Sequence, residues 1–405
     1  MTTQVLKMPE GAVTHEQGAR PAAWSGVFAM TLCVFALIAS EFLPVSLLTP
    51  MARDLNVSEG LAGYGMAISG AFAVVASLCI APLSGSMNRK TLLLLLTALM
   101  GVSGAVVALA TNYVTYMIGR ALIGVVVGGF WSMSAAVAMR LVPPRDVAKA
   151  MSIFNGGNAL ATVVAAPLGS YLGGVIGWRG AFICLVPVAV LAFAWQWISL
   201  PSMQSETSAP SFRKVFGLLK RSAVAWGMLA VGVFFMGQFV LFTYLRPYLE
   251  TVTRVDLPTL STILLVIGVA GFIGTSVIGL FLKSSVRPAL SFIPLFMAAI
   301  ALALVFTGSS VAAAFVLLGL WGMAATAAPV GWWSWLARTM PADAEIGGGL
   351  MVATIQLSIA LGSTLGGALF DGSGYRITFM TSAALLVVAA VLAFSATRGK
   401  QTTSV

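Results

Sequence analysis

Apolar residues gather in long runs along the chain, and short polar segments separate these runs. A helix needs about 20 mostly apolar residues to cross the roughly 30 Å hydrocarbon core of a bilayer. Twelve runs have about this length, at residues 24–48, 60–82, 91–110, 114–139, 150–175, 181–200, 222–245, 259–282, 289–307, 311–336, 347–370 and 378–396. The pattern therefore predicts an all-α polytopic membrane protein with twelve transmembrane helices.

The longest interior polar stretch, residues 201–221, lies at the middle of the chain. We expect a six-helix bundle over residues 24–200, a cytoplasmic linker over 201–221 and a second six-helix bundle over 222–397. Polar cytoplasmic tails are expected at residues 1–23 and 398–405. The first apolar run is too long for the hydrophobic segment of a cleavable signal peptide, so it is interpreted as a spanning helix.

The two predicted bundles share a sequence segment. Residues 168–174 read LGSYLGG and residues 361–367 read LGSTLGG, so six of seven positions match, and GWR and GYR follow shortly after them. The segments lie in the fifth and eleventh predicted helices, which favours two parallel six-helix repeats. Close helix packing is expected at a proline and four glycines of these segments: Pro167, Gly169, Gly173, Gly362 and Gly366.

The distribution of charge predicts the orientation of the chain in the membrane. Hydrophobic residues make up 59% of the chain and charged residues only 8%, and the formal net charge is +10. Sixteen lysines and arginines fall in the tails, the linker and the loops of the same side, whereas five fall in the opposite loops. Because cytoplasmic loops are rich in basic residues, both termini are expected to be cytoplasmic, in the bacterial inner membrane. This topology explains the positive charge without a nucleic-acid partner.

Two charged residues are predicted to lie inside spans, Glu41 in the first helix and Arg120 in the fourth. Each is about eight residues from the face opposite the termini, which places both roughly 12 Å deep. A buried unpaired charge costs several kcal/mol in a bilayer, so each is expected to need the other. Two interpretations fit: a static ion pair that fixes helix packing, and a proton-coupled switch in which Glu41 takes up a proton when the two separate.

The sequence contains no cluster of nucleophile, base or metal ligands in its spans. The single histidine, His15, is in the N-terminal tail, which excludes a histidine relay inside the membrane. We therefore expect no enzyme activity, no metal and no cofactor, with a proton gradient as the driving force.

Uncharged side chains are expected to line a substrate cavity. Amides and hydroxyls suit a neutral polyhydroxylated solute, and aromatic faces suit a flat ring. The candidates are Phe42, Phe130, Trp131, Asn155, Asn158, Gln238, Tyr244 and Gln356. Taken singly, each of them also fits an interhelical hydrogen bond or core packing. Three tryptophans near the end of the tenth helix are interpreted as an interfacial belt: Trp332, Trp333 and Trp335.

Several segments resemble the drug:proton antiporter branch of the major facilitator superfamily. Residues 41–51, EFLPVSLLTPM, are similar to its first helix, and residues 119–124, GRALIG, to its fourth-helix Arg-x-x-x-Gly motif. Residues 166–170, with the GWR that follows, resemble its fifth-helix antiporter motif. Residues 140–145, 237–247 and 329–332 are similar to the purine ribonucleoside efflux pumps within this branch.

This resemblance implies a monomeric transporter that exports inosine, guanosine and analogues in exchange for protons. It implies coupling roles for Glu41 and Arg120, and a gating loop that carries Arg89 and Lys90. The chain departs from the family pattern at Gly85, where the gating loop usually has an acid.

Alternative functions are proton-coupled efflux of sugars or drugs by the same fold, and a membrane sensor that does not transport. Ribose and hexose hydroxyls bind the same amides, so composition does not separate nucleosides from sugars. A sensor would usually carry an appended soluble signalling segment.

Overall fold

Eleven helices in the described part of the chain are long and apolar enough to cross a membrane. The computed structural model describes residues 23–85, 87–143, 146–204, 217–282, 286–340 and 343–396. The long helices are α1 (Trp24–Asp54), α2 (Glu59–Ser84), α3 (Arg89–Ala108), α4 (Tyr113–Leu141), α5 (Val147–Val175), α6 (Gly177–Ser199), α8 (Ser222–Phe242), α10 (Leu257–Phe281), α11 (Arg287–Thr307), α12 (Val311–Thr339) and α13 (Ala344–Ala396). A short helix, α9 (Leu245–Tyr248), and a π-helical turn, η2 (Leu249–Thr253), lie between α8 and α10. Most of the predicted tails and residues 205–216 of the predicted linker are outside the described residues.

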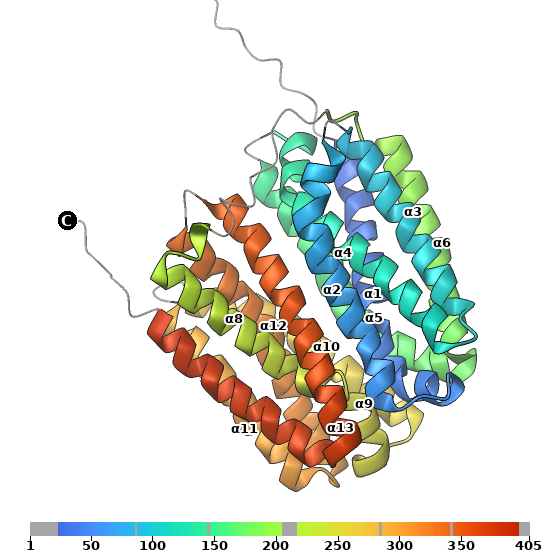
Figure 1. Cartoon of the computed structure of the whole chain (residues 1–405), viewed down its shortest axis with the longest axis vertical. Coiled ribbons are helices and arrows are strands. Elements are labelled where there is room, and N and C mark those ends of the chain that lie inside the picture. The colour runs from blue at the N-terminus through green and yellow to red at the C-terminus, as the bar shows by residue number, and fades with distance from the viewer. Residues whose placement is uncertain are drawn as a thin grey trace, which may run out of the picture.

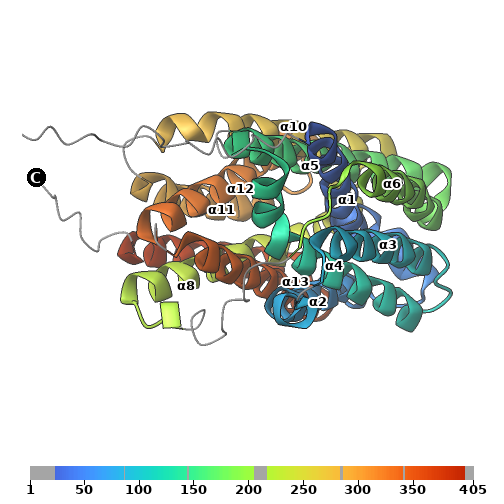
Figure 2. The ribbon, with the colours of Figure 1, turned by 90° about the horizontal axis from the view of Figure 1, so that it is seen from above.

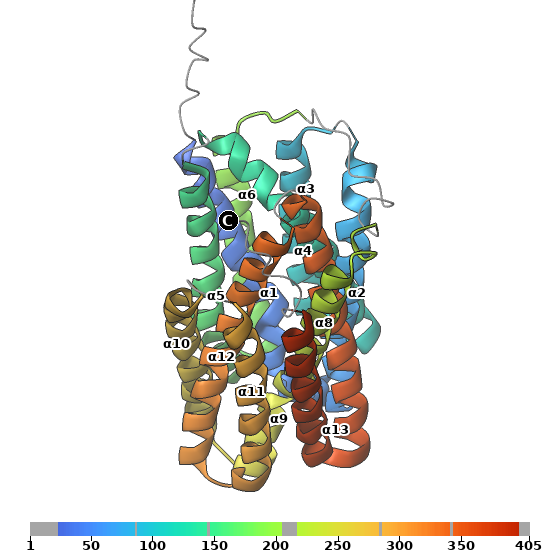
Figure 3. The ribbon, with the colours of Figure 1, turned by 90° about the vertical axis from the view of Figure 1, so that its left-hand side faces the viewer.

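Helix α13 consists of two spans. It breaks at Gly374, where φ is 78°, a left-handed conformation that costs glycine little because glycine has no Cβ. Figure 3 shows the two arms doubling back beside each other. Gly177, the first residue of α6, has a similar φ of 76°. With the arms of α13 counted separately, the described residues form twelve apolar segments, and the predicted all-α membrane fold is confirmed.

The helices form two groups that lie side by side (Figure 1). The first half contains α1 to α6, and the second half contains α8 to α13. Seen from above, α5 packs on α10 at one edge of the interface, and α2 packs on α13 at the other (Figure 2). We call the end that carries Ala23 and Ala396 the termini end, and the end that carries Gly177 and Gly374 the far end.

The repeat predicted from sequence is also present in the packing. Gly169 and Gly173 of α5 lie against the side chains of Leu43 and Leu47 in α1. In the second half, Gly362 and Gly366 of α13 lie against the backbone of Met236 and Val240 in α8. Each of these second-half residues is 193 positions after its first-half counterpart. The same glycines therefore make the same helix contact in both halves.

A second pair of contacts repeats with a slightly different spacing. Gly124 of α4 lies against the Ser69 carbonyl of α2, and Gly322 of α12 lies against the Ile267 carbonyl of α10. Both residues of the second pair are 198 positions after those of the first. Only glycine fits such a close approach of two helix backbones, as is common where transmembrane helices pack tightly.

The predicted tryptophan belt is wrong for two of its three members. Trp332 and Trp335 are 1% and 3% exposed and pack edge to face within the core of the second half. Trp333 is 42% exposed on the outside of the helix, where a membrane-facing side chain belongs. Neighbouring positions of a helix face different directions, so Trp332 and Trp335 lie in the core while Trp333 lies on the surface.

Substitution of Gly124 or Gly322 by alanine should destabilise the protein, because the new methyl group meets a helix backbone that cannot move aside. The expected loss is about 1–3 kcal/mol, the usual cost of overpacking. Thermal unfolding in detergent measures it. Gly279→Ala is the matched control, because a Cβ there meets nothing within 4 Å. A melting temperature of Gly124→Ala at or above that of the control would contradict this packing.

Candidate functional site

Pro44 leaves a gap in the hydrogen bonds of α1. Proline has no N–H, so the carbonyl of Ser40, four residues earlier, loses its helical donor. Arg120 of α4 fills the gap: its Nη1 donates to the Ser40 carbonyl at 2.8 Å, and its Nη2 donates to the Glu41 carbonyl at 3.0 Å. Its Nε also donates to the Gly65 carbonyl of α2 at 3.1 Å. The buried guanidinium thus joins α1, α2 and α4 of the first half.

The carboxylate of Glu41 points toward the other half of the molecule. Its Oε1 accepts a hydrogen bond from Nε2 of Gln356 in α13, at 3.1 Å. Glu41 and Gln356 are 4% and 5% exposed. The expected side-chain ion pair between Glu41 and Arg120 is therefore not what the structure contains. Arg120 is committed to backbone carbonyls, because the carbonyl freed by Pro44 also needs a donor in an apolar interior.

Two further candidates are Phe42, which contacts the other half, and Gln238 of α8. Phe42 follows Glu41, and its ring stacks on that of Phe239 in α8, with centroids 6.0 Å apart. Gln238 precedes Phe239, and its Oε1 is one of the buried oxygens that have no hydrogen-bond partner among the described residues. The structure thus pairs aromatic rings from the two halves, and one residue before Phe239 in α8 it leaves a buried amide oxygen without a partner among the described residues.

The remaining predicted binding residues are less open to a solute in this conformation. The hydroxyl of Tyr244 donates to the Ser363 carbonyl at 2.8 Å and to the Gly60 carbonyl of the other half at 3.3 Å. Phe130 is fully buried in the first half and packs edge to face on Trp131. Asn158 is half-buried in α5, and the side chain of Asn155 is outside the described residues.

The predicted gating-loop residues Arg89 and Lys90 are the first two residues of α3. The side chain of Asn88 accepts a hydrogen bond from the Lys90 N–H at 2.9 Å and caps the helix. The backbone N–H of Arg89 donates to the Met203 carbonyl at 2.8 Å, which ties the start of α3 to the chain after α6.

Sequence reasoning missed Asp371, which closes the far end. Its Oδ2 accepts from the Ser58 hydroxyl at 2.5 Å, and its Oδ1 accepts from the Gly60 N–H at 3.0 Å. Ser58 is the N-cap of α2, so a carboxylate of one half sits on the helix N-terminus of the other, where negative charge is favoured. Only the fold could place this residue, because its partner is more than 300 positions away.

The sequence count placed Arg246 among the five basic residues of the loops opposite the termini, but the structure places it in a buried helix. The residue lies in α9, is 7% exposed, and donates to the Ser46 carbonyl of α1 in the other half. Its Nε also contacts the carboxylate of Glu250 at 2.8 Å. An arginine–acid pair four residues apart was the available signal, since such a pair can enter an apolar interior together.

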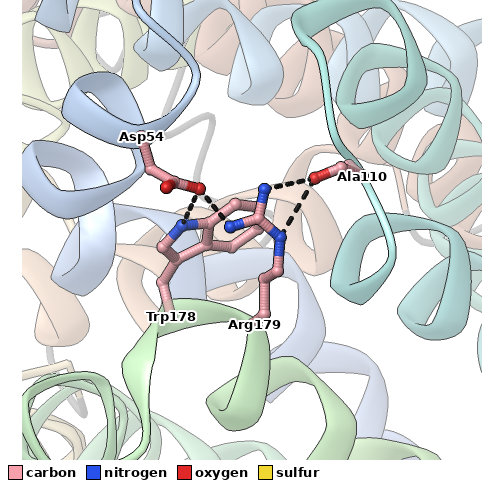
Figure 4. A network of polar contacts seen from close by, with 4 residues as sticks. All are labelled: Asp54, Ala110, Trp178 and Arg179. Carbon is pink, nitrogen blue, oxygen red and sulfur yellow. Dashed lines mark hydrogen bonds and ion pairs between the residues drawn. The ribbon is translucent and has the colours of Figure 1, made fainter.

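A separate polar network holds the far end of the first half together (Figure 4). Asp54, the last residue of α1, accepts from the Trp178 indole at 3.1 Å and forms an ion pair with Arg179. The Arg179 guanidinium also donates to the Ala110 carbonyl between α3 and α4. The GWR segment therefore ties together three helix ends that all belong to one half.

Comparison with known proteins identifies the fold and close relatives. The sequence model of the Major Facilitator Superfamily matches residues 30–347. The chain is 61% identical over 403 residues to a Pseudomonas aeruginosa protein named transcription regulatory protein OpdE, covering 99% of both chains. It is 42% identical over 376 residues to the purine ribonucleoside efflux pump NepI of Salmonella enteritidis, covering 92% of this chain and 94% of that protein.

Two solved structures share the fold at low sequence identity. One is a bacterial homologue of the human lysosomal transporter Spinster, with 17% identity, a TM-score of 0.75 and coverage of 94% of this chain and 98% of that one. The other is a D-xylose-proton symporter, with 17% identity, a TM-score of 0.75 and coverage of 93% and 99%. At this identity the likeness concerns the fold alone.

Substitution of Arg120 by lysine should destabilise the protein, because an ammonium cannot reach the three carbonyls that the guanidinium fork satisfies. A buried carbonyl left without a donor costs about 1–3 kcal/mol. The melting temperature in detergent should therefore fall strongly in Arg120→Lys. It should fall less in Arg120→Lys combined with Pro44→Ala, because the second substitution restores the N–H facing the Ser40 carbonyl. Arg221→Lys is the control, since that side chain is 60% exposed in its surface ion pair. Equal losses with and without the Pro44→Ala substitution would contradict this role of Arg120.

Proposed function

We propose that this chain, which belongs to the Major Facilitator Superfamily, exports purine ribonucleosides in exchange for protons by alternating access. The chain is a multi-pass membrane transporter and not an enzyme. Cargo, coupling ion and direction are the proposal. Their main support is the 42% identity to a named purine ribonucleoside efflux pump along almost the whole chain, together with the position of Glu41.

The hydrogen bond between Glu41 and Gln356 is the main observation that supports the proposed coupling of proton exchange to the movement of the halves. It joins a buried carboxyl of the first half to a neutral amide of the second. If the halves separate here, Glu41 loses its partner and meets water, where it exchanges a proton. When they close again, the carboxyl returns to an apolar interface that opposes a bare charge. Proton uptake and release are thereby linked to the movement of the halves.

The conformation of the structure fits one step of this cycle. Hydrogen bonds between the halves gather from the depth of Glu41 to the far end, at Tyr244, Arg246 and Asp371. With the termini in the cytoplasm, as the basic residues favour, the far end is periplasmic. The described conformation is then the one closed toward the periplasm, in which cargo enters from the cytoplasm.

The interface offers groups suited to a nucleoside. The Phe42 and Phe239 rings present apolar faces for a flat base, and the Gln238 oxygen can accept a hydrogen bond from a base N–H or a ribose hydroxyl. A sugar has the hydroxyls without the flat base, and a hydrophobic drug has apolar rings without the ribose hydroxyls. The combination favours a nucleoside over these alternatives.

The relative named as a transcription regulatory protein supports a second candidate, a regulatory role. The match covers 99% of that relative, so its activity is performed by a chain of the same length and the same helices. A transporter of this kind changes transcription when it alters the cellular level of a small molecule that a separate regulator binds. Regulation is then a consequence of transport and needs no direct contact with nucleic acid.

Proteoliposomes loaded with inosine test the proposed function. Under an imposed pH gradient the wild type should move inosine, with no competition from glucose, and Glu41→Gln should lower the coupled flux about tenfold or more, because an amide cannot exchange the proton. Asp343→Asn is the control, since that acid lies in a surface ion pair. If glucose displaces inosine, the nucleoside assignment is wrong. If Glu41→Gln transports normally, the carboxyl has a structural role.

The regulatory candidate is tested by transcript profiles of a deletion strain complemented with wild-type or Glu41→Gln protein. We expect that only the wild type restores the parental profile, because regulation follows from flux. Membrane levels of the two proteins, measured by immunoblot, control for expression. Full restoration by a transport-dead variant would show that the protein regulates transcription without transport.

A further inference from the structure

A second proline of α1 creates a gap that the other half of the molecule fills. Pro50 has no N–H, so the carbonyl of Ser46, four residues earlier, loses its helical donor. Ser46 is fully buried, where an unsatisfied carbonyl is costly. The donor it receives is the Arg246 guanidinium, from α9 of the second half.

The local structure of the second half explains why Arg246 reaches α1. Helix α8 ends at Phe242, because Pro247 cannot donate to the Thr243 carbonyl and disfavours a continued helix. The chain restarts as the short α9, which packs against α1 and turns Arg246 toward it. Glu250, one turn later, contacts the same guanidinium and balances its charge.

The internal repeat supplies a comparison. The residues 193 positions after Ser46 and Pro50 are Phe239 and Thr243. Thr243 has an N–H, and this donates to the Phe239 carbonyl at 3.4 Å, while its hydroxyl donates at 2.8 Å. The second half therefore satisfies the equivalent carbonyl within its own helix. The Ser46 carbonyl therefore needs the Arg246 guanidinium as a donor only because Pro50 lacks an N–H.

The other proline of α1 provides a contrast. The Ser40 carbonyl freed by Pro44 is satisfied by Arg120, which belongs to the same half. This bond stays intact when the halves move as units. The bond between Arg246 and Ser46 joins the two halves near the far end, so it breaks when that end opens.

We propose that Arg246 and the Ser46 carbonyl form a latch that holds the far end closed, and that Pro50 creates it by leaving this carbonyl without a helical donor. The latch rests on the alternating-access cycle proposed above and is independent of the cargo. When the far end opens, Arg246 keeps its contact with Glu250. The Ser46 carbonyl then gains water from the cavity of about 430 Å³ that Pro50, Arg246 and Glu250 help to line.

Distances between spin labels at Thr111 and Ser309 test the latch. Both residues are exposed at the far end, one in each half. In lipid nanodiscs, with Cys33, Cys79 and Cys184 replaced, Pro50→Ala should raise the ratio of the long-distance to the short-distance population about tenfold, the effect of losing one hydrogen bond to a charged group. Arg246→Gln should give a similar shift when Pro50 is present and little further shift when it is combined with Pro50→Ala.

Pro44→Ala is the matched control, because it removes a proline from the same helix but affects a carbonyl held within one half. Its population ratio should stay close to that of the wild type. Equal shifts for Pro50→Ala and Pro44→Ala, or additive shifts for Pro50→Ala and Arg246→Gln, overturn the latch and leave the proposed transport cycle standing. A single distance in every variant at every pH overturns the alternating-access cycle and the latch together.

Discussion

A backbone carbonyl without a hydrogen-bond donor is costly in the interior of a membrane protein, and this constraint determines where the buried arginines lie. Two prolines of α1 free two carbonyls, and Arg120 and Arg246 each satisfy one of them. The guanidinium group suits this task because it stays charged and presents several donors in a rigid fork. Its commitment to carbonyls also explains why the carboxylate of Glu41 turns to Gln356.

The two halves share their helix packing but differ in the polar residues that this packing supports. In both halves a glycine and the residue that it contacts recur together, 193 positions apart for one pair of helices and 198 for another. At the repeat positions of Glu41 and Arg120, however, the second half has Phe234 and Leu318, which are fully buried. The interface between the halves differs in the same way. Gly70 faces the backbone of Gln356 on one edge, whereas Gly268, at the equivalent position, faces Val163 on the other.

Comparison with the relatives distinguishes the fold, which is shared, from the cargo and the coupling, which the fold does not specify. Solved proteins with 17% identity share the fold, and a shared fold does not specify the cargo. Glu41, on which the proposed coupling rests, stands at a position where the repeat symmetry fails. The polar machinery of this chain lies largely in α1 and in the side chains that approach it from α4, α9 and α13.

The sequence by itself determined the helices, their number and the repeat. An apolar run of about 20 residues spans a bilayer as a helix. Motifs that occur twice, such as those around Gly169 and Gly362, indicate a structural repeat. The sequence also identified Glu41 and Arg120, because a charge inside a span is rare. The sequence could not decide that Arg120 donates to the backbone carbonyl of Glu41 and not to its carboxylate. Nor could it decide that Arg246 is buried or that Asp371 accepts hydrogen bonds at the N-terminus of α2. Those contacts join residues from different helices and often from different halves, and a side chain chooses among acceptors only when the tertiary structure has brought them within reach.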